Sequence, residues 1–284
     1  RVKMSKKFKN RFDYWKKTSF SKSQWKELIL FAKKKKIFFL SSVFSIEAVE
    51  LLYSLGQRVF KIGSGEFFSK DILDKIIELN GSAIISTGMS TNNEITNLIK
   101  YLKIKKAKFV IMQCTSSYPC DFSNVNLHMI DHFKKKYRCL VGYSDHTGNV
   151  MAPILALTKK ISFLECHVQD RISLFNPDSS SSISLKELNF ISEFNKFFYE
   201  SEKNSQIKHK DKVAKILFKN RILFSKSLAL KKNTKRGEII GLSNLTMKKP
   251  GYGIKFNQIS KVLGKKLKKN KSNLRLLRLS DIEK

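Results

Sequence analysis

The sequence predicts an α/β protein made of parallel strand–helix units and followed by a small β-rich domain. Short apolar runs alternate with amphipathic stretches through residues 1–200. The runs are apolar at consecutive positions, which is typical of parallel strands covered on both faces. From Ile216 onward the pattern changes to short strands separated by turns that contain glycine or proline.

Six apolar runs are predicted to be strands, and each is followed by a segment with helical periodicity. The predicted strands are Ile37–Ser42, Val59–Gly63, Ala83–Thr87, Phe109–Thr115, Cys139–Ser144 and Ile161–His167. The predicted helices are Ser21–Lys34, Ile46–Leu55, Lys70–Leu79, Asn92–Leu102, Leu127–Lys136, Val150–Lys159 and Leu185–Tyr199. Six strands suit an open doubly wound sheet, whereas an eight-stranded barrel needs two more, so this pattern leaves both architectures open.

The chain is predicted to divide into a strand–helix domain over residues 1–200, a polar linker over 201–215 and a terminal domain over 216–284. Its apolar content of 42% indicates a globular protein. No apolar run approaches the length of about 20 residues that crosses a bilayer, so no membrane partner is predicted.

The formal net charge of +33 raises the alternative of nucleic-acid binding. The lysines are spread along the whole length and form no nucleic-acid-binding motif, which favours compositional drift over a specific nucleic-acid surface. The four cysteines form no CxxC pair or disulfide framework, so we predict a reducing cytoplasmic location.

Polar and ionisable residues follow the predicted strands, at the end where parallel barrels place their active sites. Lys61 begins the segment Lys61-Ile-Gly-Ser-Gly-Glu66, in which a lysine and backbone amides suit an anion. Glu66 is a candidate acid or base, although the segment also fits a tight turn with a solvated glutamate. Tyr118 follows a later strand, where it could bind substrate or cap the core.

Two histidines each close an apolar run, His146 and His167. Neighbouring strand ends could present both imidazoles to one divalent cation and leave other coordination positions open for substrate. The alternative is that each histidine is a hydrogen-bonded structural residue.

Taken together, the strand-end motifs resemble those of the sialic acid synthase family, which includes N-acetylneuraminate, legionaminate and pseudaminate synthases. The motifs are Lys61-Ile-Gly-Ser-Gly-Glu66, Ser86-Thr-Gly-Met89, Cys114-Thr-Ser-Ser-Tyr-Pro119, Gly142-Tyr-Ser-Asp-His-Thr147, Glu165-Cys-His167 and Pro177-Asp178. The terminal segment, with Lys235-Arg-Gly-Glu238 and Lys249-Pro-Gly-Tyr-Gly253, resembles the antifreeze-like (SAF) domain of that family.

The resemblance implies a (β/α)8 TIM-type barrel followed by a SAF domain. It implies a transferase that condenses phosphoenolpyruvate with an N-acetylmannosamine-type hexose, giving a nine-carbon 2-keto acid and phosphate. The cofactor would be Mn2+ or Mg2+, and the protein would form a domain-swapped homodimer. Which sugar is the acceptor does not follow from the sequence.

The resemblance also implies residue roles. His146 and His167 would bind the metal and Glu66 would handle the proton of the attacking water. Asp178 would contact sugar hydroxyls, and Lys249 stands where the family has an arginine that reaches the sugar from the second subunit. The implied phosphoenolpyruvate contacts are Ser42, Lys61, Ser64, Ser86, Ser116, Tyr118 and Ser144.

The family pattern begins with two further strand–helix units that have no counterpart here, so about six of eight strands are expected. The chain begins with Arg1 and is expected to be an N-terminally truncated copy. The alternative function is therefore an inactive fragment or pseudoenzyme that keeps the fold.

Overall fold

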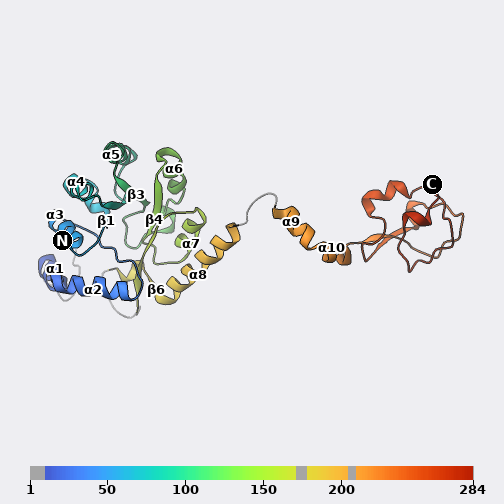
Figure 1. Ribbon diagram of the computed structural model, residues 1–284, viewed down its shortest axis with the longest axis horizontal. Helices are drawn as coiled ribbons and strands as arrows, with labels where there is room; N and C mark the ends of the chain where they lie inside the picture. The colour runs from blue at the N-terminus through green and yellow to red at the C-terminus, as the bar shows by residue number, and fades with distance from the viewer. Residues whose placement is uncertain (1–9, 171–177, 204–208, 284) are drawn as a thin grey trace. The chain divides into compact units, whose positions relative to one another are not determined.

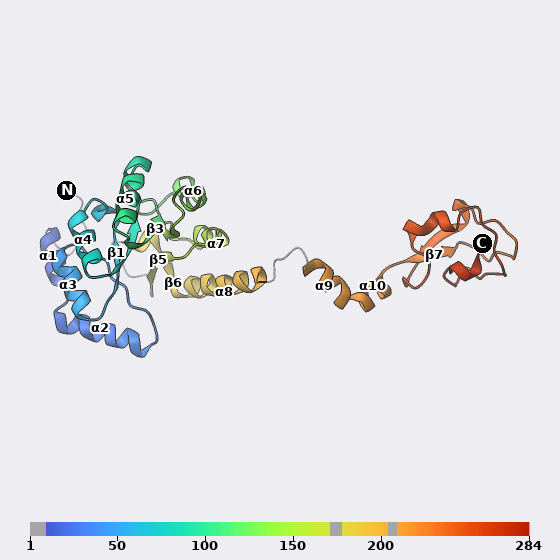
Figure 2. The same ribbon diagram turned by 45° about the horizontal axis from the view of Figure 1, so that its top comes forward.

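The computed structural model describes residues 10–170, 178–203 and 209–283. The chain forms two compact units, Arg1–Glu200 and Ser201–Lys284. In the first unit, helices surround a parallel sheet (Figures 1 and 2). None of the described helices is both long and apolar enough to cross a membrane.

The sheet of the first unit contains six parallel strands that pair in chain order from β1 to β6. They are β1 (Val59–Ile62), β2 (Ser82–Ser86), β3 (Lys108–Gln113), β4 (Leu140–Asp145), β5 (Leu164–Gln169) and β6 (Ser182–Ser184). Strand order that follows chain order is the topology of a TIM-type barrel, whereas a doubly wound sheet reverses at a switch point. The barrel prediction is therefore confirmed for these six strands.

Alternation along the strands divides the core into two layers. One face carries Phe60, Ile85 and Val141, which are fully buried against the surrounding helices. Residues one position away, such as Ile84 and Met112, form a separate apolar cluster on the opposite, inner face. Successive side chains of a strand point to opposite faces of the sheet. Polar residues at the strand ends that lie an even number of positions from Ile84 or Met112 therefore lie on the same inner face.

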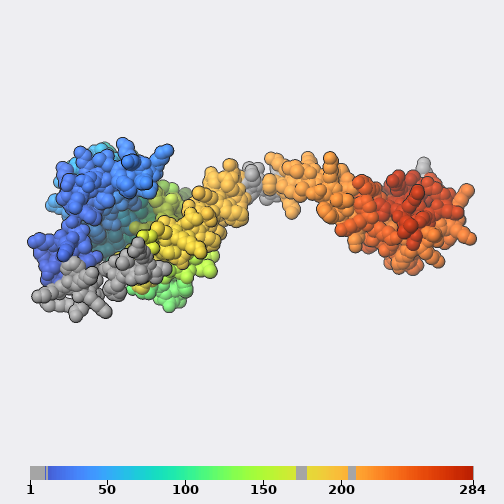
Figure 3. Space-filling model, turned by 90° about the horizontal axis from the view of Figure 1, so that it is seen from below, coloured from blue at the N-terminus to red at the C-terminus, as the bar shows by residue number. Residues whose placement is uncertain are grey.

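Helices precede, connect and follow the strands and bury one face each. They are α3 (Ile46–Ser54), α4 (Lys70–Glu78), α5 (Asn92–Ile104), α6 (His128–Tyr137), α7 (Met151–Thr158) and α8 (Leu185–Glu202). Caps define several starts: Ser45 caps α3, and Thr91 forms a capping box with Glu94 at α5. Two helices, α1 (Arg11–Thr18) and α2 (Lys22–Lys34), precede the sheet. The space-filling view in Figure 3 shows α2 and α8 on the same face of this unit.

One predicted strand was wrong, and one observed strand was not predicted. The run Ile37–Ser42 forms only an isolated parallel bridge between Ser42 and Lys61, with backbone hydrogen bonds from Lys61 to Ser41 and from Val43 to Lys61. Ile37 and Phe38 are 64% and 72% exposed, so most of this run has no ladder partner within the described residues. The sixth strand is instead β6, in a serine-rich segment where the sequence predicted no strand. It forms because β5 offers it backbone partners and because Ile183 packs on Leu157 and Ile191.

The terminal unit contains the antiparallel pair β7 (Ser227–Leu230) and β8 (Leu245–Lys248) around its own apolar core. Isolated bridges and short 3-10 turns complete this unit, which agrees with the β-rich pattern of the sequence. Two short helices precede it, α9 (His209–Ile216) and α10 (Phe218–Phe224). The segment 201–215, predicted to be a polar linker, therefore contains most of helix α9.

A buried ion pair holds the C-terminal end of this unit. Asp281, 2% exposed, accepts hydrogen bonds from the Lys271 ammonium and from the backbone N–H of Arg278, and Lys269 lies 3.7 Å away. Burial disfavours the charged carboxylate, but these donors and the two lysine charges outweigh it and lower the pKa of Asp281.

We expect Asp281→Asn to destabilise the terminal unit by about 3–5 kcal/mol, because Lys271 would keep a buried charge without its partner. Hydrogen exchange across residues 225–283 of the full chain measures this loss, with the exposed Glu283→Gln as control. Because the folded pKa is depressed, the contribution is complete above the unfolded pKa of about 4 and is lost as the pH falls through the folded value. Unchanged exchange rates in Asp281→Asn would contradict this role.

Candidate active site

The site lies on the inner face of the sheet, beyond the carboxyl ends of the strands. Strand register explains which side chains meet there. Ser144 on β4 pairs with Glu165 on β5, so the same register places His146 beside His167 two residues further on. The two imidazole ring centroids are 5.4 Å apart. Alternation on neighbouring strands thus brings both predicted histidines to one place.

His146 is buried and is oriented by its backbone surroundings. Its Nδ1 lies 2.8 Å from the carbonyl oxygen of Thr115, and its own carbonyl accepts a hydrogen bond of 2.8 Å from the N–H of Cys120. A carbonyl only accepts hydrogen bonds, so Nδ1 carries the proton and the Nε2 lone pair faces the site. Burial, reinforced by the charge of His167, lowers the pKa of His146 although the bond to Thr115 opposes this, which favours the neutral ring.

The phenol of Tyr118 contacts both histidines. Its hydroxyl lies 3.1 Å from His146 Nε2, and its ring centroid is 4.2 Å from that of His146 and 5.7 Å from that of His167. Burial, helped by the nearby charges of Cys114, Asp178 and Glu165, raises the pKa of Tyr118 to about 12. Tyr118 is therefore a neutral hydrogen-bond donor at the mouth of the sheet.

Lys61 forms the second centre of the site. Its side chain is 8% exposed, and its Nζ donates to Ser86 Oγ at 2.7 Å and lies 3.2 Å from Glu165 Oε2. Lys61 and Glu165 also line a pocket of about 290 Å³ whose other walls are mostly apolar. A lysine side chain that faces a pocket with apolar walls is suited to bind a phosphate or carboxylate.

Hydroxyl and thiol groups join the ends of β1, β2 and β3. Ser64 accepts a hydrogen bond of 3.1 Å from the N–H of Gly88, and its Oγ lies 3.5 Å from Cys114 Sγ. A Cβ on Gly88 would lie 2.3 Å from Ser116 Oγ and 2.7 Å from Cys114 Sγ. Only glycine therefore allows the three loops to approach this closely.

The remaining predicted residues lie at the edge of this group or outside it. Glu66 belongs to the short 3-10 turn Ser64–Glu66 and is half-buried, while Asp178 is exposed and acts on Tyr118 through its charge. Ser42 is exposed and is joined to the site by its backbone bridge to Lys61. Lys249 lies in the terminal unit, with its Nζ 5.5 Å from the ring centroid of Phe224.

The sequence analysis missed two residues that contribute to the candidate site. Glu165 is the ion-pair partner of Lys61, and its parity with His167 on β5 could have revealed it, because residues two apart share a face. Asp145 is 1% exposed and fixes the loop after His146 by accepting hydrogen bonds from the hydroxyls of Tyr143 and Thr147 and from the N–H of Thr147.

The residues fit a divalent cation as two imidazole ligands. A neutral ring whose Nδ1–H is held by a carbonyl presents Nε2 as the ligand atom, which is the usual arrangement at metal sites. Within residues 10–170, 178–203 and 209–283, no group of three or more His, Cys, Asp or Glu side chains could hold a metal ion. The protein would thus supply His146 and His167 and leave the other positions to water or substrate.

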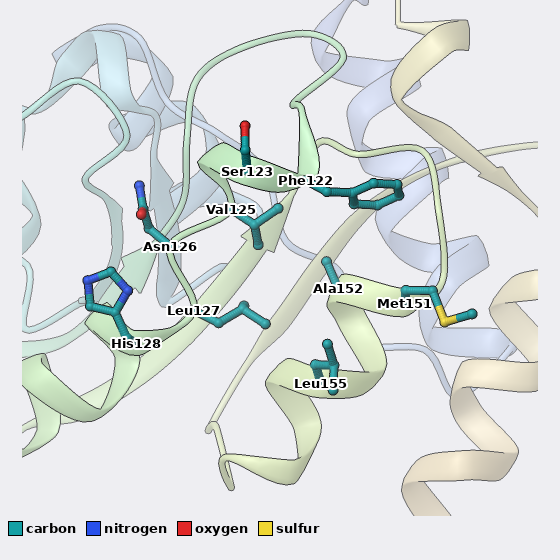
Figure 4. Close-up of a pocket in the computed structure, with 9 residues that line it drawn as sticks. All are labelled: Phe122, Ser123, Val125, Asn126, Leu127, His128, Met151, Ala152 and Leu155. Atoms are coloured by element: carbon teal, nitrogen blue, oxygen red, sulfur yellow. The ribbon is translucent and has the colours of Figure 1, made fainter.

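A separate pocket of about 520 Å³ lies between the segment from Phe122 to His128 and helix α7 (Figure 4). Figure 4 shows Phe122 and Met151 at its edge, with Ala152 and Leu155 from α7. Its lining is largely apolar and includes no residue of the group around Lys61 and His146. We therefore place the candidate active site at the strand ends.

Comparison with known proteins agrees with this architecture. The model described as the NeuB family matches residues 1–204, and the SAF domain model matches residues 225–283. The N,N'-diacetyllegionaminic acid synthase of Campylobacter jejuni is 36% identical over 260 residues, which cover 89% of this chain and 75% of that protein. The pseudaminic acid synthase of Helicobacter pylori is 28% identical over 266 residues, which cover 92% of this chain and 76% of that protein.

A solved structure supports the fold. The N-acetylneuraminic acid (sialic acid) synthetase of Leptospira borgpetersenii, crystallised with citrate, aligns with a TM-score of 0.66 and 24% identity. The alignment covers 75% of this chain and 76% of that structure. The resemblance based on strand-end motifs is thus confirmed: the chain belongs to the NeuB family and carries a SAF domain.

Proposed function

We propose that this protein condenses phosphoenolpyruvate with an N-acetylated hexose, forming a nine-carbon 2-keto acid and inorganic phosphate. The observation that carries the proposal is the convergence of a buried cation, Lys61, and two imidazoles on the inner face of one sheet. The names of the relatives, which are legionaminic and pseudaminic acid synthases, support this reaction class.

In this reaction, C3 of phosphoenolpyruvate attacks the aldehyde carbon of the open-chain sugar and forms the new C–C bond. Water then adds at C2, and the C2–O bond to phosphate breaks to release phosphate and leave the 2-keto group. Of the two protons of this water, one ends on the former aldehyde oxygen and the other on the released phosphate. Lys61 and Ser86 bind the anionic end of phosphoenolpyruvate, and the hydroxyls of Ser64, Ser116 and Ser144 surround it. Glu66 accepts the proton of the attacking water.

His146 and His167 would hold Mn2+ or Mg2+, which would supply Lewis-acid polarisation of the sugar aldehyde oxygen. The backbone bond from His146 to Thr115 keeps Nε2 directed into the site. Asp178 contacts hydroxyls of the sugar, and Lys249 from the terminal unit of a second subunit would contact the sugar in a domain-swapped dimer. We also propose that the protein acts in the cytoplasm.

The test supplies the purified chain with Mn2+, phosphoenolpyruvate labelled with ¹⁸O at the bridging oxygen, and N-acetylmannosamine or a diacetylated 6-deoxyhexose. We expect phosphate release that requires the sugar, with the label in the phosphate because the C–O bond breaks. The 2-keto acid is identified by its mass. Phosphate that lacks the label, or that forms without the sugar, would indicate a phosphatase and contradict the proposal.

A second candidate is a protein that keeps the fold and the ligand site without turnover. One observation favours it: β1 and β6 are the two edges of the described sheet and are not paired with each other. This candidate predicts binding of phosphoenolpyruvate, measured by calorimetry, without phosphate release with any acceptor. Phosphate release together with calorimetric binding of phosphoenolpyruvate therefore distinguishes the two candidates.

A further inference from the structure

The hydroxyl of Tyr118 lies at the nitrogen that would bind a metal ion. Nδ1 of His146 faces the Thr115 carbonyl at 2.8 Å and must carry the ring proton, so Nε2 holds the only free lone pair of the neutral ring. Tyr118 lies 3.1 Å from this Nε2. A phenol carries its proton near neutral pH, so Tyr118 donates to Nε2.

No other contact with His146 Nε2 is as short in the described part of the chain. Ser144 Oγ lies at 3.4 Å, which is the outer limit for a hydrogen bond. The Tyr118 ring packs on the imidazole of His146 with a tilt of 35° and meets His167 edge-on. The phenol therefore lies against both rings that form the candidate metal site.

Tyr118 can leave this position without disturbing the core. Its side chain is 50% exposed, and it belongs to the segment after β3. The next residues are fixed independently, because Cys120 N–H donates to the His146 carbonyl at 2.8 Å. Rotation of the phenol would free Nε2 while the backbone stays in place.

We propose that Tyr118 competes with the divalent cation for the lone pair of His146 and so lowers the metal affinity of the substrate-free protein. This inference rests on the proposed function only in taking His146 as a metal ligand. A metal ion that enters the site must break the Tyr118–His146 hydrogen bond first. The affinity then depends on where the phenol points, and a substrate that draws the phenol away strengthens metal binding.

The test is Mn2+ binding to the full chain without substrates, followed by the electron paramagnetic resonance signal of free Mn2+. Tyr118→Phe keeps the ring and removes the hydroxyl, so we expect its Kd to fall by about two- to tenfold, as loss of one competing hydrogen bond predicts. Tyr101→Phe is the matched control, because it removes a hydroxyl that donates to Asp74 on the outer helices and is expected to leave the Kd unchanged.

A second measurement follows the ¹⁵N chemical shift of His146 Nε2 in the metal-free protein. We expect it to move in Tyr118→Phe toward the value of an unbonded imine nitrogen. An unchanged chemical shift would overturn the inference. An equal Mn2+ affinity in Tyr118→Phe would also overturn it, because the hydroxyl would then have no effect on metal binding. A weaker affinity would overturn it too, because the hydroxyl would then help to bind the metal. If the wild-type protein and His146→Ala bound Mn2+ equally, the metal assignment in the proposed function would fail instead.

Discussion

His146→Ala is expected to reduce metal-dependent turnover by about 10²–10⁴-fold, and His167→Ala by a similar factor. Each change removes one of the two imidazoles whose ring centroids lie 5.4 Å apart. Polarisation of a carbonyl by a metal ion lowers a barrier by several kcal/mol, and each 1.36 kcal/mol is about a tenfold change in rate. Phosphate release at saturating Mn2+ and phosphoenolpyruvate measures the effect.

The control is His132→Ala, because His132 is exposed on α6 and lies outside the site. It is expected to retain the activity of the wild-type chain. The melting temperature of each variant separates a loss of function from a loss of fold. Full activity in either His146→Ala or His167→Ala would show that the imidazoles do not serve the reaction.

Lys61→Met is expected to weaken phosphoenolpyruvate binding by about 30-fold or more. Methionine has a similar length but no charge, and loss of one partner in a buried charge interaction costs about 2–5 kcal/mol. Among the described residues, Lys61 Nζ contacts Ser86 Oγ and Glu165 Oε2, both on the inner face where we propose that the anion binds. Calorimetric titration of phosphoenolpyruvate, without the sugar, measures this affinity directly.

Lys134→Met provides a matched control. Lys134 is a partly buried lysine on α6 that donates to the carbonyl of Lys160 at 2.7 Å, away from the strand ends. It is expected to change the stability of the fold and leave the affinity for phosphoenolpyruvate unaltered. Equal affinities in Lys61→Met and the wild type would exclude Lys61 from the anion site.

Local patterns predicted most of the barrel unit. Continuous apolar runs identified β1 to β5, because each of these strands is covered on one face by helices and on the other by the interior of the sheet. They failed at Ile37–Ser42, which is apolar but has only one bridge partner, and at Ser182–Ser184, which is polar but has a strand beside it. Backbone pairing with a neighbouring strand, and not amino-acid composition, determines whether these two segments form strands.

Sequence reasoning placed the candidate site residues at strand ends, and their roles stay predictions. The structure brings Lys61 to Ser86 and His146 to His167. The Thr115 carbonyl and the Cys120 N–H act through backbone atoms, which the pattern of side chains in the sequence does not reveal. Lys249 belongs to the terminal unit, and its role at the sugar stays a prediction.

The main-chain bonds that hold His146 have an evolutionary consequence. Every residue has a backbone carbonyl, and every residue except proline has a backbone N–H. Substitutions at Thr115, which supplies a carbonyl, or at Cys120, which supplies an N–H, can therefore preserve the orientation of the imidazole. The orientation of the His146 imidazole therefore depends on few side chains. Substitutions elsewhere on the surface of this lysine-rich chain, in which Lys and Arg make up 56 of 284 residues, can then accumulate without moving this ring.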